Sequence, residues 1–344
     1  MKTTELIFPA EWAGQDFIQL TWPHEDSDWL YMLNEVTECF TCLAHAIVGF
    51  QPLLIVCRDA RVVRAQLGDV DQAKITLVEL PSNDTWARDH GGISVFRDGK
   101  PVLCDFTFNG WGLKFAANHD NAITRQLYKS GLFAKEVEYQ NCLDFVLEGG
   151  SLESDGNGTL LTTSECLLSD NRNEKLTKEE IEKVLSDRLG IKRFLWLHHG
   201  YLAGDDTDSH IDTLARFCDP DTIAYVKCDN ETDKHYPELK AMEQELKQFR
   251  TANGKPYRLL PLPMAEAVIE EGERLPATYA NFLILNGGVL VPTYNSPLDS
   301  VAIEQLQKAF PSRQVVGVDC LPLIKQHGSL HCVTMQYPKG FLNI

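Results

Sequence analysis

The chain has 344 residues, of which 44% are hydrophobic, and a formal net charge of −17 at pH 7. A chain of this length and composition can bury a large core, which excludes disordered and collagen-like classes of protein. The negative charge argues against nucleic acids and anionic membranes as partners, because both repel an acidic protein. It favours encounters with small cations, although solubility alone explains many acidic surfaces.

The sequence contains no run of eighteen apolar residues, and its first residues, MKTTELIFPAEW, lack the basic and apolar regions of a secretory signal. The ten cysteines are irregularly spaced, and a chain of this length does not depend on disulfides for its stability. We therefore expect a soluble cytoplasmic protein with reduced thiols. A homo-oligomer is compatible with the sequence.

Short β-rich apolar runs alternate with longer amphipathic stretches along the chain. Runs of strand length occur at residues 52–58, 74–80, 92–97, 145–151, 158–163, 193–197, 222–228, 257–263, 281–292, 313–319 and 331–337. Stretches of helix length occur at residues 26–50, 120–132, 177–189, 236–251 and 300–310. This alternation predicts an α/β fold, and the lack of a linker predicts one domain over residues 1–344. Strand pairs and helices recur about every sixty to seventy residues, which fits about five similar units.

The segment GDDTDSHID, Gly204 to Asp212, places four aspartates beside His210 after a strand-like run. Such a concentration of negative charge requires a cation to relieve it. In an extended chain His210 and Asp212 point to the same face, so an imidazole and a carboxylate would line one pocket. A solvated acidic loop that caps the next helix is one alternative, and a His/Asp transition-metal site is another. An EF-hand is excluded, because the glycine and glutamate that a calcium loop requires are missing from their positions.

Two further segments place charged side chains beside paired glycines. Residues 85–92 read TWARDHGG, in which Trp86, Arg88 and Asp89 precede two glycines that allow a ligand to approach the backbone. A surface Arg–Asp pair with a core tryptophan is the alternative. In the second segment Glu148 ends an apolar run just before two glycines, where it is either a binding group or a solvated strand end.

Near the end of the chain, the segment HGSLHC places Cys332 after a Gly-Ser turn and before a strand-like run. A thiol presented to a cleft becomes a nucleophile where nearby positive charge lowers its pKa. Taken alone, a buried inert thiol explains this cysteine better. Cys39 and Cys42 lie in a helical stretch without a redox-type context, so we interpret them as core packing.

Several segments together resemble one family. The sequences WARD, FNGWG, EGGSLESDGNGTLLTTSECLLSDNRN, GDDTDSHID, RLPATYANFLILNGGVLVPTYNSPLD and GSLHC are similar to those of the agmatine deiminases and the bacterial peptidylarginine deiminase family, members of the pentein superfamily. The matches run from about residue 8 to residue 337. The resemblance implies a five-bladed, pseudo-symmetric α/β propeller (the pentein fold) with its active site on the central axis. It also implies a hydrolase that needs neither a cofactor nor a metal.

The resemblance further implies roles for the residues singled out above. Cys332 is the expected nucleophile, which attacks the guanidinium carbon, expels ammonia and forms an amidino-thioester. His210 is the expected general acid and base. Asp89 and Asp212 are the expected carboxylates that hold the guanidinium nitrogens, and Glu148 is expected to orient His210 or to bind one of those nitrogens.

Two residues are assigned to the surroundings of the substrate. Trp86 is the expected aromatic wall, and Asp206 is expected to meet the far ammonium of a diamine-like ligand. The expected reaction is the hydrolysis of agmatine to N-carbamoylputrescine and ammonia. A deiminase for arginyl residues or another guanidine, an amidinotransferase, and a non-enzymatic binder of cationic ligands are the alternatives.

The chain departs from the family pattern at three places. His90, Gly91 and Gly92 follow Asp89 where the family commonly has Thr-Gly-Pro. His327 stands where a glycine is usual, and Ser209 replaces a glycine before His210. None of these changes removes a reacting group, but each is expected to lie near the substrate.

Overall fold

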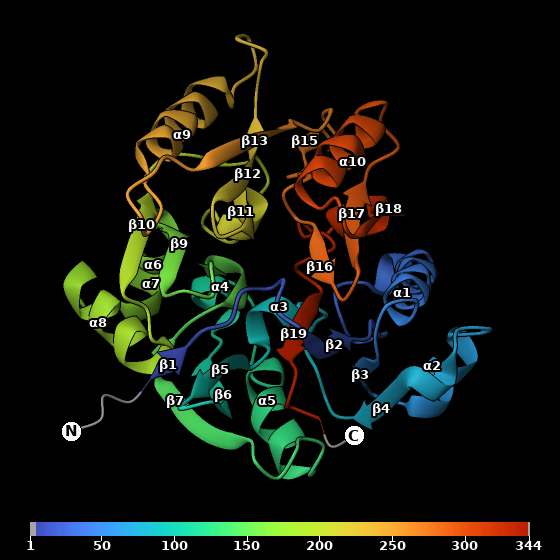
Figure 1. Cartoon of the computed structure of the whole chain (residues 1–344). Coiled ribbons are helices and arrows are strands. Elements are labelled where there is room, and N and C mark those ends of the chain that lie inside the picture. Colours follow the sequence, from blue (N-terminus) through green and yellow to red (C-terminus); the bar gives the residue numbers. More distant parts are fainter. Residues whose placement is uncertain (1–4, 343–344) are drawn as a thin grey trace.

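Five sheets of three or four strands surround a common centre in the computed structural model, which describes residues 5–342 (Figure 1). Every sheet repeats one pattern: an antiparallel strand pair, then a strand that runs parallel to the second member of that pair. Parallel neighbours need a crossover connection, and helices on the outside of the ring provide it. The architecture is the predicted five-bladed α/β propeller.

The strands fall into blades as follows. The first blade contains β1 (Leu6–Ile7), β5 (Ile93–Arg97), β6 (Lys100–Thr107) and β7 (Glu138–Val146), and the second contains β8 (Glu153–Ser154), β9 (Thr159–Thr163) and β10 (Arg193–Leu197). The third contains β11 (Ala215–Asp219), β12 (Thr222–Lys227) and β13 (Arg258–Pro263), and the fourth contains β16 (Leu283–Leu285), β17 (Gly288–Thr293) and β18 (Gln314–Asp319). The fifth contains β19 (Thr334–Pro338), β2 (Gln15–Thr21), β3 (Leu53–Cys57) and β4 (Ile75–Glu79). A small ribbon of β14 (Ile269–Glu270) and β15 (Glu273–Arg274) lies outside this pattern.

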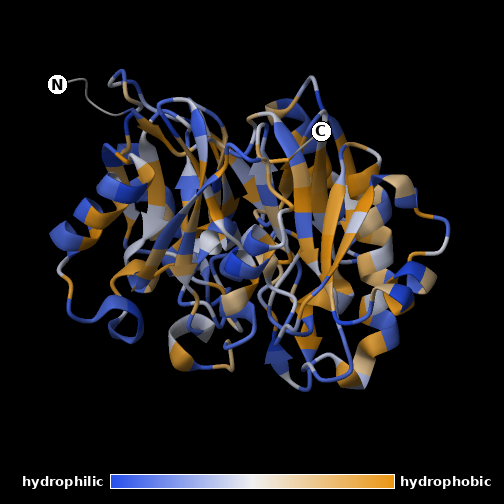
Figure 2. Ribbon diagram, turned by 90° about the horizontal axis from the view of Figure 1, so that it is seen from below, coloured by the Kyte–Doolittle hydropathy of each residue, from blue (hydrophilic) through white to orange (hydrophobic). Residues whose placement is uncertain are grey.

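The crossover helices lie outside the strands and are amphipathic. They are α1 (Leu33–Val48) and α2 (Ala60–Gln66) in the fifth blade, α5 (Asp120–Lys129) in the first, α8 (Lys178–Leu189) in the second, α9 (Tyr236–Gln248) in the third and α10 (Leu298–Ala309) in the fourth. Figure 2 shows hydrophobic colours concentrated on the strands, whereas the helices carry both kinds of residue. Helix α8 begins with a capping box, in which Thr177 and Glu180 satisfy each other's backbone N–H groups.

The ring is closed by the two ends of the chain. Strand β19 pairs antiparallel with β2, so residues that are more than three hundred positions apart lie side by side. The N-terminal part of the chain contributes β2, β3 and β4 to the fifth blade and the C-terminal end contributes β19, and the segment just before β19 carries Cys332. Ring closure therefore brings the expected nucleophile beside residues of the N-terminal third.

The structure confirms the predicted helices and most predicted strands, and it corrects the sequence analysis at several places. The run at 281–292 is a hairpin of two strands, because Asn286 and Gly287 form a tight turn in which Gly287 has a φ of 78°. Strand β7 ends at Val146, and residues 149–151 form a 3₁₀ turn instead of a strand. Strands β2, β6 and β11 were not predicted, because each mixes polar with apolar residues although it is buried on both faces. Among residues 5–342, no helix is both long and apolar enough to cross a membrane.

The contact between the first and second blades depends on a glycine. Gly190 ends α8 with a φ of 75°, and a Cβ there would lie 2.1 Å from the carbonyl oxygen of Leu6. Gly131 has a similar φ of 78°, but a Cβ there would meet nothing within 4 Å. Both glycines therefore have a left-handed backbone, but only Gly190 has no room for a side chain.

We predict that Gly190→Ala destabilises the protein more than Gly131→Ala does. A left-handed alanine costs about 1–2 kcal/mol of stability in both variants. Only Gly190→Ala also forces a backbone clash, which adds about 1–3 kcal/mol. Urea unfolding followed by tryptophan fluorescence measures the difference, and equal losses in the two variants would contradict the prediction.

Candidate active site

A cavity opens at the centre of the ring and encloses about 720 Å³ of empty space, including its open mouth. Four of the residues predicted from the sequence line it: Trp86, Asp89, Asp206 and Cys332. His210, Asp212 and Glu148 are fully buried and do not form part of its wall. They lie one contact behind it, since His210 approaches Asp89 and Asp212 precedes the wall residue Thr213. Distant segments thus converge as predicted.

Cys332 is held by its backbone and by one amide. Its carbonyl oxygen accepts the N–H of Arg88 at 3.1 Å, and its Sγ lies 3.4 Å from Oδ1 of Asn281. Burial raises the pKa of the thiol well above its usual value, and the carboxylates of Asp212 and Asp89 raise it further. Positive charge brought close to the sulfur would lower this pKa and favour the thiolate.

His210 lies between two carboxylates. Its Nε2 is 2.9 Å from Oε2 of Glu148, and its Nδ1 is 3.6 Å from Oδ1 of Asp89. Burial alone lowers the pKa of an imidazole, but the charge of Asp89 and the hydrogen bonds to Cys166 and Glu148 raise the pKa of His210 well above its usual value. A raised pKa favours the protonated imidazole, which is the form that can act as an acid.

Glu148 has a cationic partner that the sequence analysis did not single out. Arg172 lies in the one-turn helix α7 (Asp170–Asn173), and its Nε is 3.0 Å from each carboxylate oxygen of Glu148. The same guanidinium donates to Oδ2 of Asp208 at 2.6 Å and to the carbonyl oxygen of Thr207 at 2.9 Å. Burial opposes ionisation, but His210, and after it Arg172, lower the pKa of Glu148 below its usual value. Arg172 lies within a segment of the family resemblance, but its role depends on partners 24 to 36 positions away.

Asp212 also has an unforeseen partner. Its Oδ2 accepts a hydrogen bond from Nδ1 of His331 at 2.7 Å, whereas its Oδ1 is buried without a partner. Burial opposes ionisation, but the hydrogen bond and charge of His331 lower the pKa of Asp212 below its usual value. Residues 211–213 form a 3₁₀ turn that leads into β11, so our extended-chain premise is wrong, and so is the alternative of a loop that caps a helix.

Aromatic side chains form part of the cavity wall. Trp86 packs against Gly328, where a Cβ would lie 2.0 Å from the indole ring, so the ring is fixed beside the segment that leads to Cys332. Trp111 was missed as a site residue, although FNGWG belongs to the resemblance; its Nε1 donates to Oδ2 of Asp89 at 2.9 Å. Both rings line the cavity.

The outer end of the cavity is acidic. Asp206 is about half exposed, and its Oδ2 lies 3.9 Å from Nδ1 of His327. Burial raises the pKa of Asp206, and the neighbouring Asp205 raises it as well, while His327 opposes both effects. Asp28, Asp84 and Asp205 lie on the same wall. A cationic group would be stabilised at this end.

The departures from the family pattern have a structural explanation. Ser209 and His327 replace glycines, and both occupy the left-handed region, with φ values of 61° and 67°. The glycine of the family pattern suits these positions, and this chain fills them at some cost in backbone strain. His327 lines the cavity, but His90 is buried beside Thr21 and does not. The expectation that His90 lies near the substrate is therefore not met.

One group among the described residues brings three potential metal ligands together: Glu148, Cys166 and His210, whose ligand atoms lie within 4.8 Å of one another. Arg172 already donates to both oxygens of Glu148, so a second cation there would face a buried guanidinium. The donor set is thus better suited to the guanidinium it already binds. The expected absence of a metal stays a prediction.

Residues 7–338 match the model of the Porphyromonas-type peptidyl-arginine deiminase family. The chain belongs to this family. The predicted resemblance is thereby confirmed, and the match covers all five blades.

Solved structures and curated relatives agree with this family. A crystal structure from Porphyromonas gingivalis, provisionally named an arginine deiminase, is 58% identical with a TM-score of 0.95 and covers 98% of this chain and 100% of its own. The agmatine deiminase of C. jejuni, in a cysteine-to-serine form with substrate bound, is 37% identical with a TM-score of 0.92, covering 99% and 98% of the two chains. A Shewanella baltica protein, provisionally named an agmatine deiminase, is 37% identical over 96% of this chain and 94% of its own length.

The family site depends on close packing at Gly150. A Cβ there would lie 2.4 Å from Nδ1 of His210 and 2.8 Å from Oδ1 of Asp89, the same atom that accepts the Gly150 N–H at 3.0 Å. Gly317 in β18 is similarly crowded, by Thr293 and Ile303, but lies in a different blade from Gly150.

We predict that Gly150→Ala lowers kcat/KM at least about 100-fold, because a displacement of about 1 Å in a reacting group has that effect. Gly317→Ala is the matched control, which should lose stability but keep the activity of its folded fraction. Steady-state kinetics together with thermal unfolding separates the two effects. Wild-type kcat/KM in Gly150→Ala would show that the His210–Asp89 spacing does not matter.

Proposed function

We propose that the protein hydrolyses a small guanidino compound, with agmatine as the substrate, to a ureido product and ammonia. The observation that carries this proposal is the convergence of the Cys332 thiol with Asp89 on one cavity wall, backed by the buried side chains of His210 and Asp212. A guanidinium is planar and cationic, and carboxylates on its nitrogens hold it against a nucleophile. The substrate-bound C. jejuni agmatine deiminase, 37% identical, supports the same assignment.

The first half of the reaction uses the charge of the substrate. The guanidinium places a positive charge between Asp89 and Asp212, which lowers the pKa of the Cys332 thiol, so the thiol releases its proton to water and becomes a thiolate. The sulfur attacks the central carbon and forms a neutral tetrahedral adduct. His210 then donates its proton to one amino group, which leaves as ammonia, and the carbon stays on sulfur as a cationic amidino-thioester.

The second half hydrolyses this intermediate. The now neutral His210 accepts a proton from water as the oxygen attacks the carbon, which restores a tetrahedral centre. Collapse expels the Cys332 thiolate and releases the ureido product, and the remaining proton leaves with ammonia as ammonium. Glu148 and Arg172 hold the imidazole in place throughout.

The charge of the cavity supports agmatine over arginine. None of the described residues on its wall is Lys or Arg, whereas five are aspartates. The α-carboxylate of arginine would lie among like charges without a partner, which disfavours its binding. The distal ammonium of agmatine would meet Asp206 and its acidic neighbours. Arginine is the second candidate, because the 58% identical P. gingivalis relative is provisionally named an arginine deiminase.

We further propose that residues 1–344 form a single domain, since strands from both ends of the chain share the fifth blade. A homo-oligomer and a cytoplasmic location stay predictions.

We predict that Cys332→Ser abolishes turnover, by at least about 10³-fold, while the protein still binds agmatine, because only the nucleophile is lost. Product formation measures turnover, and calorimetry measures binding. Cys42→Ser is the control, since Cys42 is exposed on α1 and should leave both unchanged. Turnover in Cys332→Ser would contradict the mechanism, and inactivity of the wild type on every guanidine would favour a binding protein.

We predict that kcat/KM for agmatine exceeds that for arginine and for a blocked arginyl peptide by at least about 100-fold. Asp206→Asn should narrow this ratio by raising KM for agmatine, because one partner of the ammonium loses its charge. Asp229→Asn removes the same charge from a largely exposed site and should not change the ratio. A higher kcat/KM for arginine would overturn the choice of agmatine, and transfer of the amidino group to an added amine would identify an amidinotransferase.

A further inference from the structure

The residue before the nucleophile, His331, bridges two buried carboxylates. Its Nδ1 lies 2.7 Å from Oδ2 of Asp212, and its Nε2 lies 2.7 Å from Oε2 of Glu11. The imidazole is 1% exposed, so water does not compete for either nitrogen. A neutral imidazole has one N–H and can donate to only one of two ionised carboxylates. Two contacts this short therefore require a proton on each ring nitrogen.

Glu11 is kept ionised from its other side. Arg216, which is fully buried, donates to Oε2 of Glu11 at 2.7 Å, and Arg88 approaches the same oxygen at 4.0 Å. Burial opposes ionisation, yet the charges of Arg216, His331 and Arg88 lower the pKa of Glu11 well below its usual value. Glu11 is therefore an anion, and it supplies the negative charge that a doubly protonated His331 needs.

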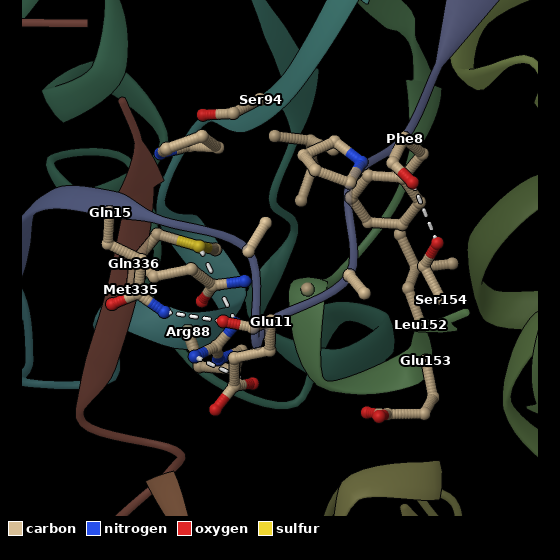
Figure 3. Close-up of a pocket in the computed structure, with 16 residues that line it drawn as sticks. Phe8, Glu11, Gln15, Arg88, Ser94, Leu152, Glu153, Ser154, Met335 and Gln336 are labelled. Carbon is tan, nitrogen blue, oxygen red and sulfur yellow. Dashed lines mark hydrogen bonds and ion pairs between the residues drawn. The ribbon is translucent and has the colours of Figure 1, made fainter. Parts of the chain in front are cut away.

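These contacts form one line of alternating charge that ends at the active site. It runs from Glu153 through Arg216, Glu11 and His331 to Asp212, with contacts of 2.6, 2.7, 2.7 and 2.7 Å. Glu11 and Glu153 line a second cavity, which shares no wall residue with the cavity of Cys332. Figure 3 shows Glu11 beside Arg88 in this second cavity, and the side chain of Glu153 extends toward them from the other side.

At the active-site end, this line leaves one oxygen of Asp212 free. The Oδ1 atom is buried without a hydrogen-bond donor, while the other oxygen belongs to His331. A buried carboxylate oxygen without a partner is costly unless a ligand supplies the donor. The backbone of His331 is fixed too, because its N–H donates to Oδ1 of Asn281 at 2.8 Å, and the same oxygen lies 3.4 Å from Sγ of Cys332.

We propose that His331 is a positioning residue: as an imidazolium clamped by Glu11, it holds Asp212 ionised and oriented, with one oxygen left for the guanidinium. This proposal rests on the deiminase function above. It adds His331 and Glu11 to the residues on which the reaction depends, although neither lines the substrate cavity.

The clamp predicts a pH dependence that an ordinary structural contact would not give. Asp212 faces His331, His210 and Arg216, which favour its ionised form, and lies near Asp89 and Cys332, which oppose it. The guanidinium is held only when Asp89 and Asp212 are both ionised. Burial raises the pKa of Asp89 to about 6, whereas His331 helps to keep the pKa of Asp212 below its usual value, so Asp89 sets a one-proton acid limb in the wild-type kcat/KM profile. Without the charge of His331 the pKa of Asp212 rises toward that of Asp89, and the limb then takes up two protons.

The test compares Glu11→Gln with Glu153→Gln. In Glu11→Gln the anion that faces Nε2 is gone, so His331 becomes neutral and donates only to Asp212. We expect the acid limb to steepen from one proton toward two. Glu153→Gln is the matched control, because it removes a buried carboxylate from the same Arg216 without touching His331, and burial already raises the pKa of Glu153 to about 7. Its profile should keep the one-proton limb. A one-proton limb in Glu11→Gln, or the same steepening in both variants, would overturn the clamp.

A second measurement needs no variant enzyme to be active. In wild-type protein labelled with ¹⁵N at histidine, both ring nitrogens of His331 should give protonated imidazolium signals at pH 8, assigned by their absence in His331→Gln. A bare nitrogen on His331 in an active enzyme would overturn this proposal alone. A wild type that hydrolyses no guanidine would instead overturn the proposed function, whatever the state of His331.

Discussion

The centre of this protein is built on the burial of carboxylates, which is unfavourable unless each one has a partner. Three of them lie around the cavity, and their partners differ. Glu148 has the guanidinium of Arg172 and the imidazole of His210, and Asp212 has His331. Asp89 has only the neutral donors Trp111 and Gly150 within hydrogen-bond distance, and burial raises its pKa to about 6.

The three carboxylates therefore differ in how much positive charge each one lacks. Both oxygens of Glu148 are bound by protein cations, so this carboxylate orients the imidazole of His210. Asp89 has no cation within hydrogen-bond distance, and Asp212 has one oxygen without a donor. A planar cation with several N–H groups can donate to both of these carboxylates at once. The same carboxylates act on Cys332, because burial first, and then the charges of Asp212 and Asp89, raise the pKa of its thiol. Binding of a cation and activation of the sulfur are therefore one electrostatic event.

Family and fold were predictable from the sequence, because the motifs around Asp89, Glu148, His210 and Cys332 are local strings of residues that resemble one family, and that resemblance implied the propeller. The alternation of strands and helices by itself indicated only an α/β fold. The supporting residues were not predictable in the same way. Arg172, Trp111 and His331 lie within the same motifs, but their roles depend on side-chain partners 22 to 320 positions away, and Glu11 meets His331 only after the ring closes. Strands such as β2 escaped notice for a related reason: Gln15 and Gln19 are buried there, and their amide groups bond to other core residues.

Two of the chain's three departures from its family lie where the fold can best accept change. At Ser209 and at His327, the left-handed backbone that glycine adopts freely lowers the stability by about 1–2 kcal/mol. Each recovers part of this through contacts that glycine lacks: Oγ of Ser209 donates to Glu165, and the ring of His327 reaches the carbonyl oxygen of Gly204 at 2.6 Å. Both contacts lie in or on the acidic loop. The buried partners of Asp212 and Glu148 cannot be replaced in the same way, because the loss of any one of them leaves a buried charge without a partner. Selection for a different far end of the substrate can therefore act on the loop at the mouth without disturbing the charges that hold the guanidinium.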